Sequence, residues 1–169
     1  MAKTKPKVVL VVHNVRSAYN VGSMMRTAEG LGVEDVYLTG FTPYPFFAKD
    51  SRPPHIAAKA DRMIAKTALG AENSLKWSYK EKISELINEF RREDYSIVAL
   101  EQTSEALLLP EFKLVPKVAL IVGSEVGGLT TDVLDLADQH VQIPMQGAKE
   151  SFNVSVAAAI ALYHLKYLA

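Results

Sequence analysis

Three polar stretches of the chain carry side chains that could bind or modify a nucleotide-like ligand. The first runs from Asn20 to Thr27 and contains Gly22 and Arg26, which lie four residues apart. That spacing puts both residues on one side of a helix. A glycine near a helix N-terminus allows close approach of a phosphate or ribose, and arginine offers a forked donor. The alternative interpretation is a packing glycine and an ordinary surface arginine.

The second stretch is GSEVGG, Gly123 to Gly128, which places the carboxylate of Glu125 between glycines. It is not the GxGxxG fingerprint, so it does not favour a nicotinamide cofactor. The third stretch, IPMQGAKESFN, is interrupted by a proline and a glycine and contains Ser151 and Asn153. Both residue types are good helix N-caps. The small apolar residues that follow, over 154–168, predict a buried or interface helix.

The stretches follow runs that predict β-strands. The predicted strands are Lys7–His13, Asp35–Thr39, Ser74–Tyr79, Ser96–Glu101, Lys117–Val122 and Gln139–Ile143. The predicted helices are Asn20–Gly32 with Asn20 as N-cap, His55–Lys66, Lys80–Glu93, a helix after GSEVGG, and the C-terminal helix. Gln102–Pro116 reads as an irregular connection. Alternating strands and helices indicate an α/β fold with a mostly parallel sheet, which binds ligands at the carboxyl ends of its strands.

Composition excludes several functional classes. The 169 residues are 49% hydrophobic, which suits one compact domain. The absence of cysteine excludes disulfides, thiolate metal sites and a cysteine nucleophile. The four histidines are far apart, so no metal site is expected. No segment has the length of a membrane span or the pattern of a signal peptide, so we expect a soluble cytoplasmic protein.

The net charge is zero, so any affinity for nucleic acid must come from a local patch. The Gly40–Pro54 loop holds three phenylalanines, and Lys49–Lys82 holds eight basic residues against four acids. Basic residues beside exposed aromatic rings suit single-stranded or irregular RNA, although an ordinary solvated surface is the alternative. The expected RNA contacts are Phe46, Phe47, Lys49, Arg52, Lys59, Arg62 and Lys66.

Three longer segments, in this order, resemble the SpoU (TrmH-type) family of RNA 2′-O-ribose methyltransferases, within the SPOUT superfamily. They are NVGSMMRTAEGLGVEDVYLTG, LIVGSEVGGL and IPMQGAKESFNVSVAAAIALYHL, and KTALGAE is similar to family members as well. The resemblance implies a sheet whose C-terminal segment forms a deep trefoil knot, with S-adenosylmethionine bound there and a homodimer as the assembly. It also implies a single catalytic domain over 1–169, without the separate N-terminal RNA-binding domain that many members carry.

The resemblance also implies the roles of individual residues. Arg26 would deprotonate the ribose 2′-hydroxyl, or orient it and stabilise the developing oxyanion, because a guanidinium normally stays protonated. The residues expected to position ribose, phosphate and arginine are Asn20, Glu125, Ser151 and Asn153. The expected cofactor contacts are Leu100, Glu101, Gly123, Ser124, Gly128, Ile143, Pro144, Met145, Ser151, Phe152, Asn153 and Val154.

Two other functions stay open at this point. A SPOUT enzyme that methylates a base is disfavoured by the NxGxxxRTA pattern at Asn20–Ala28, which the family ties to ribose chemistry. Pyrimidine methylation through a cysteine adduct is excluded by composition. A non-enzymatic RNA-binding or assembly protein would be expected to lose Arg26 or the cofactor loops, and the chain retains both.

Overall fold

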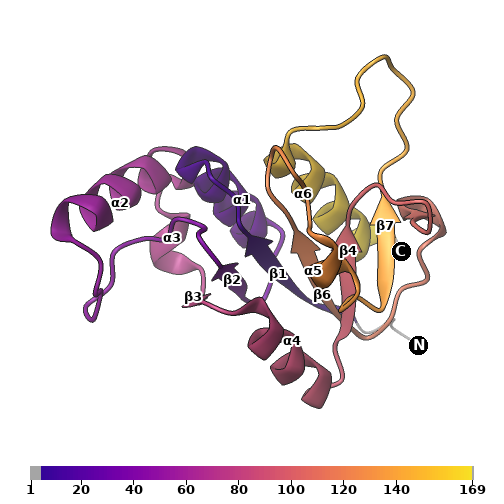
Figure 1. Cartoon of the computed structure of the whole chain (residues 1–169), viewed down its shortest axis with the longest axis horizontal. Helices are drawn as coiled ribbons and strands as arrows, with labels where there is room; N and C mark the ends of the chain where they lie inside the picture. Colours follow the sequence, from indigo (N-terminus) through magenta and orange to yellow (C-terminus); the bar gives the residue numbers. More distant parts are fainter. Residues whose placement is uncertain (1–4, 169) are drawn as a thin grey trace.

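A seven-stranded parallel sheet forms the centre of the computed structural model, which describes residues 5–168 (Figure 1). The first four residues and Ala169, which the expected 1–169 domain includes, lie outside the described residues. The strand order is β3-β2-β1-β6-β4-β7-β5. The strands are β1 Lys7–His13, β2 Val36–Thr39, β3 Trp77–Lys80, β4 Ser96–Leu100, β5 Leu107–Leu108, β6 Lys117–Val122 and β7 Gln139–Gln142. Every pairing in the sheet is parallel, as predicted.

Helices cover both faces of this sheet (Figure 1). They are α1 Ala18–Gly30, α2 Pro54–Ala68, α3 Ala71–Ser74, α4 Ile83–Arg92, α5 Thr131–Leu134 and α6 Val154–Tyr163, which continues as a π-helix over His164–Leu168. The central strand β1 shows why both faces need cover. Val8, Leu10 and Val12 are fully buried in one core with α1 and α6, while Val9 and Val11 belong to a second core with α4. Strand side chains alternate between faces, so a continuous apolar run serves two cores.

Several element boundaries differ from the sequence predictions. Helix α1 begins at Ala18 and not at Asn20, because the Ser17 hydroxyl accepts a hydrogen bond from the Asn20 N–H at 3.2 Å and caps the helix. The prediction that Asn20 is the N-cap is therefore wrong. At α6 the expected cap is confirmed, since the Asn153 side chain accepts from the Ser155 N–H at 2.9 Å.

Short elements account for the other differences. Strand β3 begins three residues later than expected, at Trp77, and Ser74, the expected first residue, is the last residue of α3. Strand β5 lies within the segment predicted to be irregular, where Leu107 and Leu108 pair with β7. Such short elements depend on a neighbour already in place, so local pattern does not predict them. Among the described helices, none combines the length and the apolarity needed to cross a bilayer.

Candidate active site

The Gly123–Gly128 loop, which follows β6, is a tight main-chain turn. Ser124 and Gly128 exchange two backbone hydrogen bonds, of 3.2 and 3.0 Å. A Cβ on Gly123 would lie 2.6 Å from the carbonyl carbon of Gly128, and Gly128 has a φ of +62°. Both positions therefore require glycine, one for space and one for backbone conformation.

Glu101, at the end of β4, holds this glycine turn against the neighbouring strand. Its Oε2 accepts a hydrogen bond from the Leu129 N–H at 2.8 Å, and its Oε1 accepts one from the Gln102 N–H at 3.0 Å. A Cβ on Gly128 would lie 2.1 Å from Glu101 Oε2, so the carboxylate occupies the space that the glycine leaves. The carboxylate thus fixes the main chain on which the site is built.

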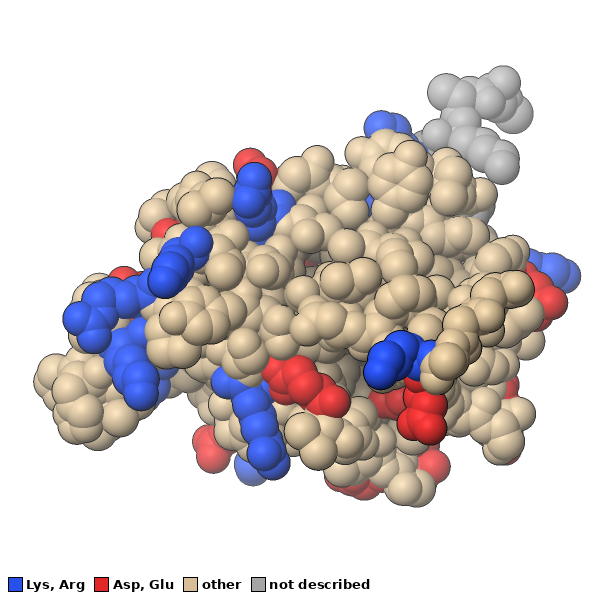
Figure 2. All heavy atoms as spheres, turned by 90° about the horizontal axis from the view of Figure 1, so that it is seen from above, with Lys and Arg blue, Asp and Glu red and all other residues tan. Residues whose placement is uncertain are grey.

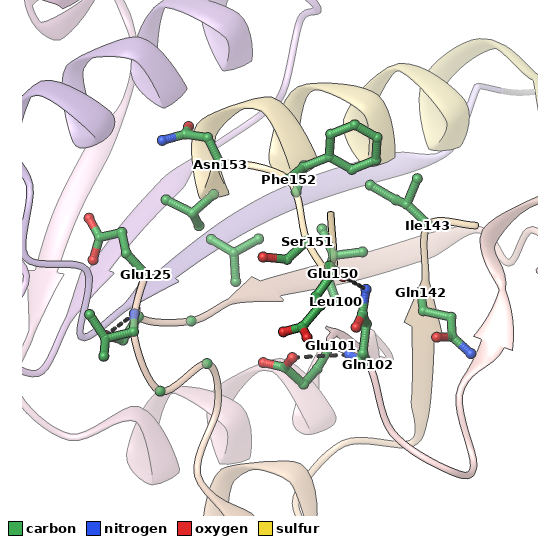
Figure 3. Close-up of a pocket in the computed structure, with 18 of the residues that line it drawn as sticks. Leu100, Glu101, Gln102, Glu125, Gln142, Ile143, Glu150, Ser151, Phe152 and Asn153 are labelled. Atoms are coloured by element: carbon green, nitrogen blue, oxygen red, sulfur yellow. Dashed lines mark hydrogen bonds between the residues drawn. The ribbon is translucent and has the colours of Figure 1, made fainter. Parts of the chain in front are cut away.

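The loop between β7 and α6 is the third wall of the site. Gln102 Nε2 donates a hydrogen bond of 2.7 Å to the Glu150 carbonyl oxygen, which ties this loop to the chain after β4. Figure 3 shows Glu150, Ser151 and Gln102 together beside Glu101. Three segments far apart in sequence therefore meet at the carboxyl ends of β6, β4 and β7. Two of them are stretches that the sequence singled out, and the segment after β4 was expected from the family resemblance.

These segments enclose a cavity of about 650 Å³, within the ordinary size range of small-ligand sites. Of the residues expected to contact a cofactor, the cavity is lined by Leu100, Glu101, Gly123, Ser124, Gly128, Ile143, Met145, Ser151, Phe152, Asn153 and Val154. Pro144 is not part of the lining. Figure 3 shows Glu125 and Asn153 at one end of the cavity and Gln142 and Ile143 at the other.

Sequence reasoning did not single out several lining residues: Gln102, Val122, Val126, Gly127, Gln142, Glu150 and Ala157. Most of them directly neighbour a predicted residue, so extending each predicted segment by one or two positions would have included them. Ala157 is different, because it lies one helical turn after the cap of α6. The feature of the sequence that could have identified it is its small side chain in the first turn of a helix predicted to be buried.

At one end of the cavity, a hydrogen-bonded network joins three of the residues expected around the ribose. Asn20 Nδ2 donates to Glu125 Oε1 at 3.0 Å, and Asn153 Nδ2 donates to Asn20 Oδ1 at 3.3 Å. Because α1 begins before Asn20, the Asn20 side chain is free to form this link. The network connects α1, the glycine turn and the start of α6. Ser151 lines the cavity nearby without a hydrogen bond to these three side chains.

The Glu125 carboxylate is the centre of this network. It also accepts hydrogen bonds from the Arg16 and Ser17 backbone N–H groups, both at 3.0 Å. Partial burial would raise the pKa of Glu125, but the hydrogen bonds from Arg16, Asn20 and Ser17 outweigh it and lower the pKa. Glu125 is thus held as an anion at neutral pH, suited to positioning donors rather than to accepting a proton.

Arg26 lies apart from the network. It follows Asn20 by six residues, which turns it about 120° around the helix. Its side chain is exposed and does not line the cavity. Gly22 is fully enclosed: a Cβ there would lie 2.2 Å from Thr67 Oγ1 and 2.3 Å from the Ile64 carbonyl oxygen of α2. The expectation that Gly22 admits a phosphate or ribose is wrong, because this glycine allows α1 and α2 to pack closely.

The basic region covers the end of the molecule formed by α2. Figure 2 shows lysines and arginines gathered there, on the side from which the loop before α6 projects in Figure 1. Lys49, Lys59, Arg62 and Lys66 are all exposed.

Arg52 differs from these four residues because its guanidinium is bound within its own loop. It pairs with Asp50, donates to the carbonyl oxygens of Tyr44 and Pro45 at 3.0 and 3.3 Å, and lies 3.5 Å from the centre of the Tyr44 ring. Hydrogen bonding from Arg52 lowers the pKa of Asp50. The side chain that sequence reasoning assigned to RNA therefore holds the aromatic loop in shape.

Throughout residues 5–168, no three His, Asp or Glu side chains form a group that could hold a metal ion.

Comparison with known proteins gives an independent view of this arrangement. The model of the SpoU rRNA Methylase family matches residues 7–163. The chain is 28% identical over 166 residues to tRNA (guanosine(18)-2′-O)-methyltransferase of Aquifex aeolicus, covering 96% of this chain and 70% of the relative. It is 29% identical over 161 residues to 23S rRNA (guanosine-2′-O-)-methyltransferase RlmB of Coxiella burnetii, covering 95% of this chain and 58% of the relative.

A solved structure shares the fold. The SpoU methyltransferase AviRb of Streptomyces viridochromogenes, crystallised with the cofactor AdoMet, superposes with a TM-score of 0.78. The two chains are 23% identical, and the match covers 96% of this chain and 57% of AviRb. The chain thus spans between about half and three quarters of the length of these three proteins.

Proposed function

Because the chain belongs to the SpoU rRNA Methylase family, we propose that it transfers a methyl group from S-adenosylmethionine to a ribose 2′-hydroxyl of tRNA or rRNA. The observation that carries this proposal is the cavity, which is lined by residues of two of the three family-like segments, LIVGSEVGGL and IPMQGAKESFNVSVAAAIALYHL, and by the chain after β4. The first segment reaches its edge through the hydrogen bond from Asn20 to Glu125. The relatives that the chain matches are named as 2′-O-methyltransferases of tRNA and of 23S rRNA, which supports ribose as the acceptor and both RNA classes as candidates.

The chemistry of the cavity suits S-adenosylmethionine. Apolar side chains of Leu100, Ile143 and Met145 can pack on an adenine ring, while nearby main-chain groups offer its edge hydrogen bonds. Gly123 and its neighbours allow that close approach of main chain. The bound cofactor supplies a methyl group made electrophilic by a sulfonium. We infer that the trefoil knot expected for this family surrounds the same cavity.

The residues of this chain then have to place the ribose oxygen in line with that methyl group. Arg26 is exposed, so it can contact an RNA that approaches from solvent. Its guanidinium orients the 2′-hydroxyl and stabilises the developing oxyanion while the proton passes to solvent water. The alternative role, in which Arg26 itself accepts the proton, requires a neutral guanidinium. Asn20, Glu125 and Asn153 hold α1 against the cavity, and Ser151 lies on its wall. Positioning of this kind supplies much of an enzymatic acceleration.

We propose that two chains associate as a symmetric homodimer through α6 and its continuation. Val156, Ile160, Tyr163 and Tyr167 project large apolar surfaces from this helix, between 36% and 50% exposed. An isologous interface would bury them against the same residues of a second copy. Light scattering should give twice the chain mass at micromolar concentration, and a monomer would contradict the proposal.

We propose that RNA lies over α2 and the aromatic loop, with phosphates at Lys49, Lys59, Arg62 and Lys66. The positive charge of this region in a chain of zero net charge supports the assignment. Arg52 stays in the proposal as the residue that shapes the loop. Since tRNA and rRNA are the proposed substrates, we place the enzyme in the cytoplasm, where those RNAs work.

Two measurements test the function. Calorimetry should show S-adenosylmethionine binding with a Kd of roughly 1 μM, an ordinary small-ligand affinity. Methyl transfer to total RNA from a strain lacking the protein, followed by nucleoside analysis, should give a 2′-O-methyl nucleoside. A methylated base would identify a base methyltransferase instead. RNA binding without cofactor binding or transfer would identify an assembly protein.

A further inference from the structure

Phe41 is an exposed aromatic residue on a main chain that is held unusually firmly. Its side chain is 60% exposed, although it directly follows β2 and Gly40. Its backbone N–H donates a hydrogen bond of 3.1 Å to Asn14 Oδ1, so the loop after β2 is fixed to the loop after β1. A large apolar ring held in water by a rigid support is typical of a surface that binds a flat partner.

The support for Phe41 continues into the core. Asn14 Nδ2 lies 3.1 Å from His13 Nε2, and His13 Nδ1 lies 2.8 Å from Thr39 Oγ1. Burial lowers the pKa of His13, although Asp132 opposes this effect, so the ring is neutral at pH 7. A neutral ring with its proton on Nδ1 donates to Thr39 and accepts from Asn14. Asn14 is then oriented with its oxygen toward Phe41.

Two further contacts fix the corner of the fold at which the loops after β1 and β2 meet. The Tyr79 hydroxyl donates to the Gly40 carbonyl oxygen at 2.7 Å, and the Val15 N–H donates to Thr42 Oγ1 at 3.2 Å. Gly40 has a φ of +65°, and a Cβ there would lie 1.9 Å from Asn14 Oδ1. Only glycine allows Asn14 to come this close, so the sequence at this corner serves the placement of Phe41.

Strand register places this corner close to the cavity. His13 is paired with Thr39 on one side, and Val12 is paired with Val122 on the other, so Thr39, His13 and Gly123 lie in one row. Adjacent strands lie about 4.8 Å apart, which makes the row about 10 Å long. That length equals about three base-stacking steps of 3.4 Å. A base that reaches Phe41 therefore belongs to a nucleotide within a few positions of one at the cavity.

Arg16 lies between Phe41 and the cavity. It belongs to the loop between β1 and α1, in which Asn14 binds Phe41 and the Arg16 N–H binds Glu125. Its side chain is exposed, and among residues 5–168 its guanidinium has no hydrogen-bond or ion-pair partner. A free guanidinium fixed at its main chain is suited to a phosphate on the path between two bound nucleotides.

We propose that Phe41 and Arg16 form a subsite for a nucleotide flanking the methylated one, with its unpaired base stacked on Phe41 and a neighbouring phosphate bound by Arg16. This subsite rests on the proposed function, and it narrows the substrate to an RNA that is single-stranded or looped around its target. A paired base keeps its faces covered by neighbours, so it cannot offer one to Phe41.

The test compares binding of the full-length protein to two fluorescent strands, a short oligoadenylate and an abasic ribose-phosphate strand of equal length. Stacking on one aromatic ring strengthens binding by about 5- to 150-fold. Phe41→Leu should lose that factor on oligoadenylate and bind the abasic strand as the wild type does, while Phe41→Trp should retain it. Arg16→Gln should weaken both strands equally and lower the slope of log affinity against log salt by about 1.

Leu69→Ala is the matched control, because Leu69 is 65% exposed and lies outside the proposed subsite at the end of α2. It should bind both strands as the wild type does. Equal affinity of the wild type for the two strands, or equal losses on both strands for Phe41→Leu, would overturn the stacking role. Titration of each variant with S-adenosylmethionine keeps the two ideas separate: failure of cofactor binding in the wild type would sink the proposed function, while the strand comparison still decides the subsite.

Discussion

The carboxyl edge of the sheet has two halves that are built in different ways. At β6, β4 and β7 the wall is main chain, with glycines at points of close contact and a carboxylate that fills the space beside Gly128. At β1 and β2, and in the loop that follows β2, the surface is aromatic and basic side chains held by other side chains, as Arg52 holds Tyr44 and Asn14 holds Phe41. The first half suits a small ligand of fixed shape, and the second suits a polymer that presents many similar groups. Substitutions in the first half should therefore impair binding of the small ligand, and substitutions in the second half should impair binding of the polymer.

The largest expected effect comes from Arg26, an exposed residue of α1. Arg26→Ala should reduce methyl transfer by roughly two to four orders of magnitude, the usual range for a lost acid–base group or oxyanion donor. Cofactor affinity should stay nearly unchanged, because Arg26 does not line the cavity. Arg26→Lys should recover little, since lysine lacks the planar fork. Single-turnover transfer to the natural RNA measures both variants, and full activity of the alanine variant would remove Arg26 from the chemistry.

In the half of the sheet edge formed by β6, β4 and β7, where the wall is main chain, an added side chain should mainly weaken binding of the cofactor. In Gly123→Ala the new Cβ would meet the Gly128 main chain at 2.6 Å, so the turn has to move. We expect at least a tenfold loss of S-adenosylmethionine affinity, or about 1.4 kcal/mol, and a loss of about 1–3 kcal/mol in the free energy of unfolding. Gly30→Ala is the control, because a Cβ there meets nothing within 4 Å in α1. Its stability should rise slightly. Unchanged calorimetry of the Gly123 variant would show that the turn does not shape the cofactor site.

On α2, which follows the aromatic loop directly in sequence, charge removal should act on RNA alone. Replacing Lys59, Arg62 and Lys66 with glutamine removes three exposed cations from α2. The slope of log affinity for RNA against log salt should fall by about 2, from about 0.7 per phosphate contact with a single strand. Affinity for S-adenosylmethionine should not change. If both RNA affinity and its salt slope match the wild type, this patch is an ordinary solvated surface.

The smallest effect concerns pH and Glu125. Hydrogen bonding lowers its pKa in the folded protein despite the opposing effect of burial. Its contribution to stability is therefore present above the unfolded pKa of about 4.3 and is lost as pH falls through the lower folded value. Because the carboxylate is only partly buried and solvent screens it, we expect less than about 1 kcal/mol. Melting curves between neutral and acidic pH should show a steeper loss for the wild type than for Glu125→Gln, and parallel curves would contradict the assignment.

The two halves also differed in how far sequence could predict them. The cofactor-side residues were expected from the resemblance to the SpoU family, and the glycines among them fit that expectation because close main-chain contact demands glycine at fixed places. Arg52 could not be distinguished from Arg62 from the sequence, since both are basic residues of the Lys49–Lys82 segment. The partners of Arg52 are carbonyl oxygens of Tyr44 and Pro45, and their direction depends on loop conformation.

Local ambiguity explains the remaining differences in α1. Ser17 and Asn20 are both good N-caps, and the choice between them depends on tertiary burial of Ala18, which lies in the core. Gly22 is compatible with either ligand approach or helix packing until the position of α2 is known. The α/β class and the parallel sheet followed from periodicity and spacing, whereas these side-chain roles required neighbours from distant parts of the chain.

The hydrogen bond from Gln102 to the Glu150 carbonyl has a consequence for turnover. A neutral hydrogen bond of this kind contributes about 0.5–1.5 kcal/mol net, which corresponds to a closed-to-open ratio of about 2 to 13. The loop before α6 can therefore release this contact frequently while the buried strands stay paired. In the proposed methyltransferase we therefore expect exchange of S-adenosylmethionine to need only local opening at this wall, while the sheet that holds the rest of the site stays intact.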